Sequence, residues 1–277
     1  INELLTEVSG ILWGWPMIAL LLGTHILLTV RLRFPQRHIF KAIRLSVKKD
    51  GDAKGEVSQF GALSTALAAT IGTGNIVGVG TAIALGGPGA VFWCWITGVL
   101  GIATKYGEGL LAVKYRINSN GRMLGGPMYA IEHGLASHKS GWMRRFWKLM
   151  AVAFAFFTAI ATFGIGSTVQ ANAISTLGYE VCGISPVVIG GIVTILAAAV
   201  IMGGVKSIAR CCEMLVPFMA GIYVLGCLTI LFFNSSHLVP ALELIVSSAF
   251  NPAAASGGFV GTSIMMTARY GIARGLF

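Results

Sequence analysis

Apolar runs of about 20 residues recur along the chain, and runs of this length are what a helix needs to cross a bilayer. Of the 277 residues, 55% are hydrophobic and 11% are charged, whereas an average soluble domain has about 25% charged residues. The sequence therefore predicts an all-α integral membrane protein with one polytopic domain over residues 1–277. We expect spans at about residues 11–30, 60–85, 89–113, 149–177, 187–203 and 214–233, and the start of another at 257–277.

Positive charge orients these spans. All 20 Lys and Arg residues fall in segments that we place inside the cell or on the inner part of a span, and the expected outside loops contain none. Because Lys and Arg concentrate in cytoplasmic loops, we expect a multi-pass protein with its N-terminus outside. The net charge of +10 then reflects these loops and indicates no nucleic-acid partner.

Three segments between or after the spans predict short helices. In the basic segment 31–59, apolar residues recur at helical spacing between cations, which is typical of a helix on an anionic lipid surface. A solvated basic loop is the alternative there. Residues 128–135 predict a helix at the membrane surface, and residues 238–250 predict one over the outer mouth.

The span at 60–85 is interrupted in its own middle. An apolar run from Phe60 to Ile71 is followed by Gly72, Thr73, Gly74 and Asn75, which are poor helix formers, and then by a second apolar run. Irregular backbone in hydrocarbon survives only where it lines a cavity or is covered by protein. The break therefore predicts a binding site on a discontinuous helix, while a kinked structural helix is the alternative.

Little in the sequence favours catalysis or a bound cofactor. The five cysteines are odd in number and lack metal-ligand spacing, which argues against a disulfide framework. No metalloprotease motif or Ser/His/Asp set is evident, and His25, the one span histidine, is expected to pack or make a local hydrogen bond. We interpret Lys105 and Glu108 as a structural ion pair. We expect no enzyme, no catalytic residue and no cofactor.

Four motifs together resemble the alanine or glycine:cation symporter family, the bacterial and archaeal sodium/alanine carriers. They are IGTGNIVGV at the break, GGPGAVFWCWITGVLGIATKYGE, GGPMYAIEHGL and the terminal ARYGIARGLF. The resemblance implies two inverted five-helix repeats after one extra N-terminal helix. It also implies that this chain is the N-terminal portion, with only the first repeat and the start of the second present, and that its membrane is a bacterial or archaeal plasma or inner membrane.

The resemblance further implies symport of a small neutral amino acid, alanine or glycine, with sodium into the cell. In the wider amino acid/sodium transporter superfamily, the break ends in a glycine, an asparagine and a hydrophobic residue, and the asparagine side chain binds sodium. The matching residues here are Gly74, Asn75 and Ile76, so the resemblance assigns Asn75 to sodium. The carbonyls of Ala68, Thr70 and Ile71 fall where that superfamily places further sodium ligands. Sodium is thus expected as the coupling ion and, with the lipid bilayer, as a partner.

The substrate site follows from the same resemblance. The substrate carboxylate is expected at the backbone of Gly72, Thr73 and Gly74, where the second half-helix offers N–H groups and a positive dipole end. Gln170 corresponds to an amide on the family's third core helix. A membrane enzyme, a channel and a truncated fragment without transport activity are the alternatives.

Overall fold

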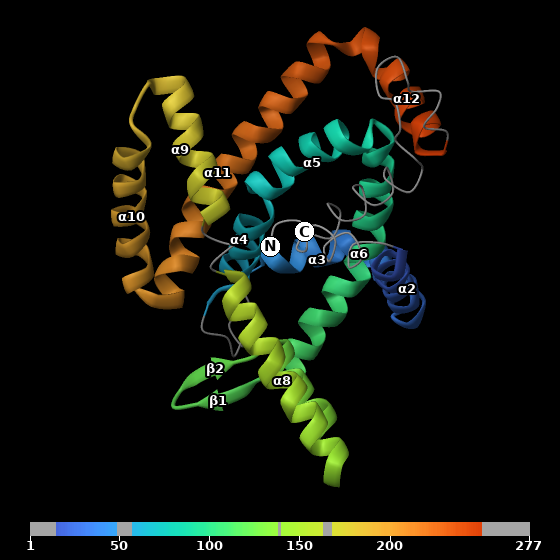
Figure 1. Cartoon of the computed structure of the whole chain (residues 1–277), viewed down its shortest axis with the longest axis vertical. Helices are drawn as coiled ribbons and strands as arrows, with labels where there is room; N and C mark the ends of the chain where they lie inside the picture. The colour runs from blue at the N-terminus through green and yellow to red at the C-terminus, as the bar shows by residue number, and fades with distance from the viewer. Residues whose placement is uncertain (1–14, 49–56, 138–139, 163–167, 251–277) are drawn as a thin grey trace, which may run out of the picture. The chain divides into compact units, whose positions relative to one another are not determined.

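The computed structural model describes residues 15–48, 57–137, 140–162 and 168–250 (Figure 1), and these are almost entirely helical. The predicted span start at 257–277 lies outside the described residues. The helices, in chain order, are α2 (Trp15–Arg31), η1 (Pro35–His38), α3 (Ile39–Val47), α4 (Gln59–Thr70), α5 (Thr73–Gly86), α6 (Gly89–Lys114), α7 (Pro127–Tyr129), η2 (Ala130–Ala136), α8 (Gly141–Ala161), α9 (Val169–Cys182), α10 (Pro186–Met202), α11 (Gly204–Phe233), η4 (Ser235–His237) and α12 (Leu238–Phe250).

One feature departs from an all-helical chain. Strands β1 (Ile117–Ser119) and β2 (Arg122–Leu124) pair antiparallel, with Ser119 opposite Arg122. Asn120 and Gly121 form the turn between them, both with positive φ, as a tight hairpin requires. The Asn-Gly pair was the signal for this hairpin in the sequence, and our prediction missed it.

All three predicted short helices are present as helical segments. Residues 128–135 fall in α7 and η2, and α12 has the predicted limits of 238–250. The basic segment contains α3, which favours a helix over a solvated loop. Helix α11 begins at Gly204, earlier than the span expected from residue 214, because a single residue separates it from α10.

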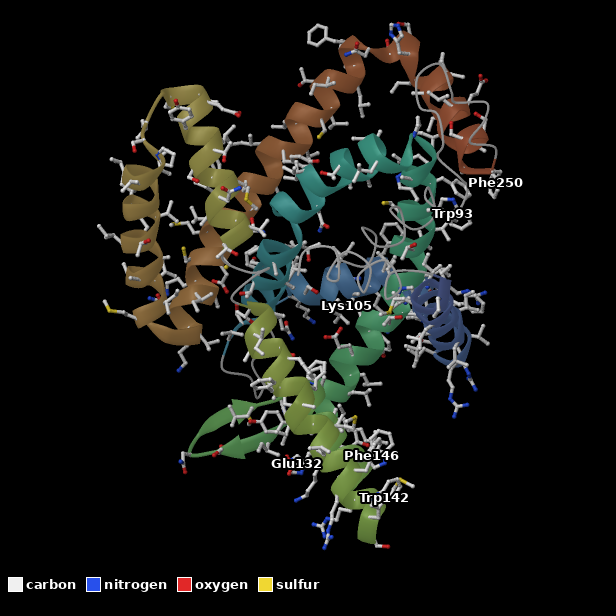
Figure 2. All side chains as sticks on the ribbon, viewed as in Figure 1. Trp93, Lys105, Glu132, Trp142, Phe146 and Phe250 are labelled. Carbon is white, nitrogen blue, oxygen red and sulfur yellow. The ribbon has the colours of Figure 1, made fainter. Side chains whose placement is uncertain are left out.

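The chain divides into two compact units, which we describe separately. Among the described residues, unit 1 comprises 15–42, 69–105 and 217–250, and unit 2 comprises those between 43 and 68 and between 106 and 216. In unit 1, α2 packs on α6 through Ile18, Leu22 and Trp93. The Trp93 ring also lies 6.1 Å from the Phe250 ring of α12 (Figure 2).

Unit 2 is held by contacts among short elements. Lys148 of α8 forms an ion pair of 3.7 Å with Glu132 of η2, and the rings of Trp142 and Phe146 stack on α8 (Figure 2). Helices α9 and α10 approach each other so closely that a Cβ added at Gly178 would collide with Ile189. The polar start of α9 also belongs to unit 2.

Length and composition identify candidate membrane-crossing helices among the described residues. Two are long and apolar enough, namely residues 59–86, counted through the break, and α11. A third arises if residues 16–31 and 35–47, which meet at a bend of 61°, form one span. Apolar helices of this kind are typical of a multi-pass membrane protein.

Candidate functional site

The predicted break in the span at 60–85 is present, but it is shorter than the sequence suggested. Helix α4 ends at Thr70 and α5 begins at Thr73, so only Ile71 and Gly72 lie between them. Gly72 is the N-cap of α5 with an extended backbone (φ −140°, ψ −178°). A single extended residue is enough to end one helix and start the next. The other predicted break residues therefore form the first turn of α5.

The Asn75 side chain forms a hydrogen bond across the break. Its amide N–H donates a hydrogen bond back to the carbonyl of Thr70, which also accepts one from the Gly72 N–H at 3.1 Å. The Gly72 carbonyl in turn accepts bonds from the N–H groups of Asn75 and Ile76, at 3.1 and 3.0 Å. Two groups that the family resemblance assigned to sodium, the Asn75 amide and the Thr70 carbonyl, are thus in direct contact.

The backbones of α4 and α5 supply partial charges at the break. Neither α4 nor α5 contains an ionisable side chain. The last turn of a helix carries a partial negative charge on its carbonyls, and the first turn carries a partial positive charge on its N–H groups. The end of α4 therefore suits a cation, and the start of α5 suits an anion, at adjacent positions along the chain.

The remaining predicted site residues fall as follows. Ala68 is half-buried in the last turn of α4, and Ile71 is half-buried between the two helices. Thr73 and Gly74 occupy the first two positions of α5. Gln170 is half-buried in the first turn of α9, in unit 2, and its placement beside the break stays a prediction.

Two polar residues that sequence reasoning did not single out meet at the other end of α4. Ser58 precedes α4, and its hydroxyl donates a hydrogen bond to Glu213 of α11. Ser58 was recognisable as an N-cap, since a serine stands directly before an apolar helical run. Its partner is 155 residues away along the chain, and no sequence pattern joins the two.

His25 is buried as expected, at 3% exposure, and Nδ1 shares a hydrogen bond of 2.5 Å with the Thr104 hydroxyl. It thereby joins α2 to α6 within unit 1, which is a structural role. The ion pair of Lys105 with Glu108 stays a prediction. No group of three His, Cys, Asp or Glu side chains among the described residues could hold a metal.

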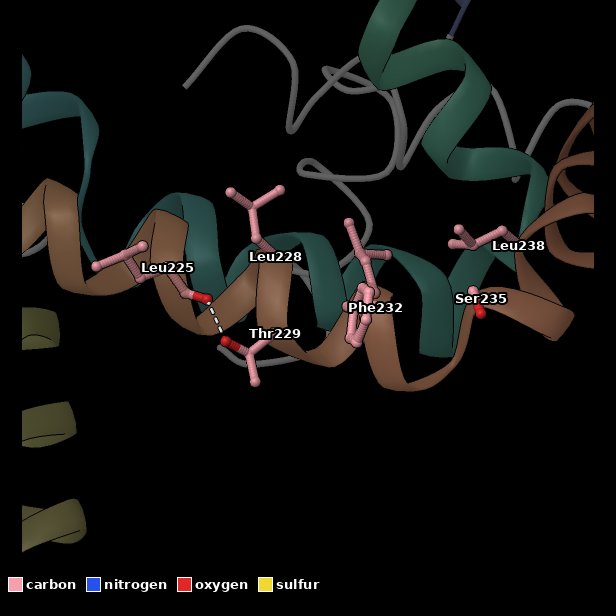
Figure 3. Close-up of a pocket in the computed structure, with 7 residues that line it drawn as sticks. Leu225, Leu228, Thr229, Phe232, Ser235 and Leu238 are labelled. Atoms are coloured by element: carbon pink, nitrogen blue, oxygen red, sulfur yellow. Dashed lines mark hydrogen bonds between the residues drawn. The ribbon is translucent and has the colours of Figure 1, made fainter.

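An open groove of about 560 Å³ lies along the second half of α11 and the start of α12 (Figure 3). Leu225, Leu228 and Phe232 dominate its lining, and the Thr229 hydroxyl already donates to the Leu225 carbonyl at 2.8 Å. The groove offers almost no free polar groups. It is unsuited to a charged solute, and the break remains the candidate site.

A discontinuous apolar helix with exposed backbone polarity is typical of membrane transporters. The sequence profile of the Sodium:alanine symporter family matches residues 1–277, and the chain belongs to this family. Its members are transporters, so the membership favours transport over a membrane enzyme or a channel.

Three relatives illustrate how similar this chain is to known transporters. Sodium/alanine symporter AgcS of Methanococcus maripaludis is 49% identical over 279 residues, which cover 99% of this chain and 59% of the relative. An uncharacterized transporter of Haemophilus influenzae is 48% identical, over 100% of this chain and 59% of the relative. Amino-acid carrier protein AlsT of Bacillus subtilis is 31% identical, over 98% and 56%. The chain thus spans somewhat more than half the length of these relatives.

Proposed function

We propose that the protein is a secondary active transporter that carries a small neutral amino acid, alanine or glycine, into the cell together with sodium. The observation that carries this proposal is the break between α4 and α5. There, Asn75 reaches the Thr70 carbonyl, and both helix ends lack ionisable side chains. Family membership and the name of the AgcS relative support the same cargo.

Sodium belongs at the end of α4 in this proposal. A hard cation takes oxygen ligands, and half-helix ends supply backbone carbonyls. Ala68, Thr70 and Ile71 would offer their carbonyls, and Asn75 would offer Oδ1. The Asn75 amide now points an N–H at Thr70. Rotating the amide by half a turn would bring its oxygen to the same place, so ion binding exchanges a hydrogen bond for a pair of ligands.

The substrate belongs at the start of α5. A carboxylate is stabilised by the N–H groups and the dipole of a helix N-terminus, which here is formed by Gly72, Thr73 and Gly74. The Gln170 amide is the proposed side-chain contact. Because no lysine or arginine is present in α4 or α5, a zwitterion fits better than an anion with a net charge, and this favours a neutral amino acid.

We further propose an arrangement for the membrane. Helix α2 is the additional N-terminal helix, and α4 to α11 form one five-helix repeat, in which α4 with α5 and α8 with α9 each count once. The N-terminus lies outside, and the membrane is the plasma membrane. The exposed apolar face of α3, with Phe40 86% exposed, supports the placement of α3 on the anionic inner leaflet.

The test is uptake of radiolabelled amino acids by the full-length protein in proteoliposomes, with an inward gradient of either sodium or choline. We expect uptake of alanine or glycine in sodium and none in choline. Glutamine, serine and a cationic amino acid complete the panel and define the substrate class. Equal uptake with both cations would refute the sodium coupling, and no uptake of any neutral amino acid would refute the proposed function.

A further inference from the structure

A carboxylate from another helix lies at the N-terminal end of α4. The Ser58 hydroxyl accepts a hydrogen bond from the Gly61 N–H at 2.8 Å, which is the usual N-cap bond. The same hydroxyl donates to Oε1 of Glu213. Because the first turn of a helix carries a partial positive charge, the Glu213 carboxylate is attracted to this end of α4 both through Ser58 and through the helix itself.

A side chain at position 61 would require the Glu213 carboxylate to move. A Cβ added at Gly61 would collide with Oε1 of Glu213, and would lie 3.0 Å from the Ser58 hydroxyl oxygen and 3.3 Å from the Glu213 carboxyl carbon. Gly61 is buried, and so is Ser64 one turn later, with 1% exposure. The glycine thus lets the carboxylate sit directly against the first turn of α4.

Both helices in this contact change compact unit near a weak point of their backbone. The chain passes from unit 2 to unit 1 after Ala68, close to the break at Ile71 and Gly72. In α11 it passes from unit 2 to unit 1 between Val216 and Pro217. A proline inside a helix has no N–H for the carbonyl four residues earlier, which in α11 is that of Glu213 itself.

We propose that Glu213 and Ser58 are positioning residues that join α4 to the first three turns of α11, so that these two segments move as one piece during transport. The break and Pro217 are the hinges of that piece. This inference rests on the proposed function, because it assumes that the site at the end of α4 must be opened and closed.

The test uses the full-length protein and a double-mutant cycle. Gly61→Ala, Glu213→Ala and the double variant are compared for substrate binding, net uptake and thermal unfolding. Gly109→Ala is the matched control, since a Cβ at this position on α6 meets nothing within 4 Å. Ser58→Ala is compared with Ser58→Thr, which keeps the hydroxyl.

We expect Gly61→Ala and Glu213→Ala each to lower the maximal uptake rate about tenfold, with substrate affinity changed less than about twofold. The double variant should be no slower than either single variant, because the added methyl group meets no carboxylate once Glu213 is truncated. Ser58→Thr should keep most of the rate that Ser58→Ala loses, and Gly109→Ala should match the wild type.

Additive losses in the cycle would overturn the proposal, as would a parallel loss of binding, which indicates a purely structural contact. If a Gly61 or Glu213 variant does not fold, the comparison of Ser58→Ala with Ser58→Thr tests the proposal through the same two quantities, the uptake rate and the substrate affinity. If the wild type takes up no amino acid, the proposed function fails. The thermal unfolding cycle then still shows whether Gly61 and Glu213 are coupled, so the two failures are distinguishable.

Discussion

The chain interrupts two of its long apolar helices in different ways. Between α4 and α5 the helical path stops, Gly72 takes an extended conformation, and the Asn75 side chain bonds the freed Thr70 carbonyl. In α11 the helix continues through Pro217 from Gly204 to Phe233. Proline leaves one carbonyl without its helical donor, but it does not separate the helix into two ends.

The difference shows what a binding site in an apolar helix requires. Two facing helix ends expose several backbone N–H and C=O groups, which would cost several kcal/mol each in hydrocarbon if unpaired. A polar side chain such as Asn75 satisfies part of that requirement while no ligand is bound. Pro217 frees a single carbonyl and adds no polar side chain, so it suits bending and not ligand binding.

The largest expected effect is at the break itself. Asn75→Ala removes both the hydrogen bond to Thr70 and the proposed sodium ligand. We expect the sodium affinity measured from uptake to fall by about 100-fold or more, since loss of a mere supporting partner of a metal ligand costs about 10- to 100-fold. Uptake at a fixed sodium concentration should fall with it.

Asn75→Asp separates the two roles of this side chain. An ionised aspartate keeps an oxygen for sodium but cannot donate to the Thr70 carbonyl. Sodium binding then breaks no hydrogen bond and gains a charged ligand, so the sodium affinity should be at least that of the wild type and far above that of Asn75→Ala. If Asn75→Ala transports with unchanged sodium dependence, the assignment of sodium to the break is wrong.

Local features of this comparison were readable from the sequence. Gly72, Gly74 and Asn75 marked the break, because these residues disfavour a helix interior. Apolar length marked the helices, and the segment 238–250 was bounded correctly. The exact extent of the break was not readable, because an asparagine within a first helical turn and an asparagine before a helix produce the same sequence pattern.

Contacts between distant segments were not readable. Ser58 and Glu213 meet because the start of α4 lies beside Glu213 of α11 in unit 2, and an apolar pattern does not specify which helices become neighbours. The hairpin at residues 117–124 was missed for another reason. Its Asn-Gly turn was present, but three-residue strands are too short for their alternation to stand out.

A smaller effect is expected at the second interruption. Pro217→Ala restores an N–H for the Glu213 carbonyl and should raise the free energy of unfolding by about 1–3 kcal/mol. If Pro217 is a hinge, net uptake should also slow several-fold. Pro186→Ala is the control, because Pro186 is at the start of α10, where its missing N–H has no helical acceptor. Unchanged uptake by a stabilised Pro217→Ala protein would remove α11 from the proposed motion.

The smallest expected effect on stability is at Gly72. Its extended backbone, with φ at −140°, is open to any residue, so Gly72→Ala should leave the melting temperature almost unchanged. Gly87, in the turn between α5 and α6, has φ of 76° and ψ of 175°, a region that is essentially restricted to glycine. Gly87→Ala should therefore cost about 1–3 kcal/mol. Thermal unfolding of the two variants in parallel measures the difference.

Activity should rank these two glycines in the opposite order. A methyl group at Gly72 lies where the backbone is proposed to meet the substrate carboxylate, and close approach of backbone to ligand is what glycine permits. Gly72→Ala should thus weaken alanine binding in a folded protein of normal stability, while the Gly87→Ala protein that remains folded should bind normally. Normal binding by Gly72→Ala would move the substrate away from the break and leave Asn75 there as a structural cap.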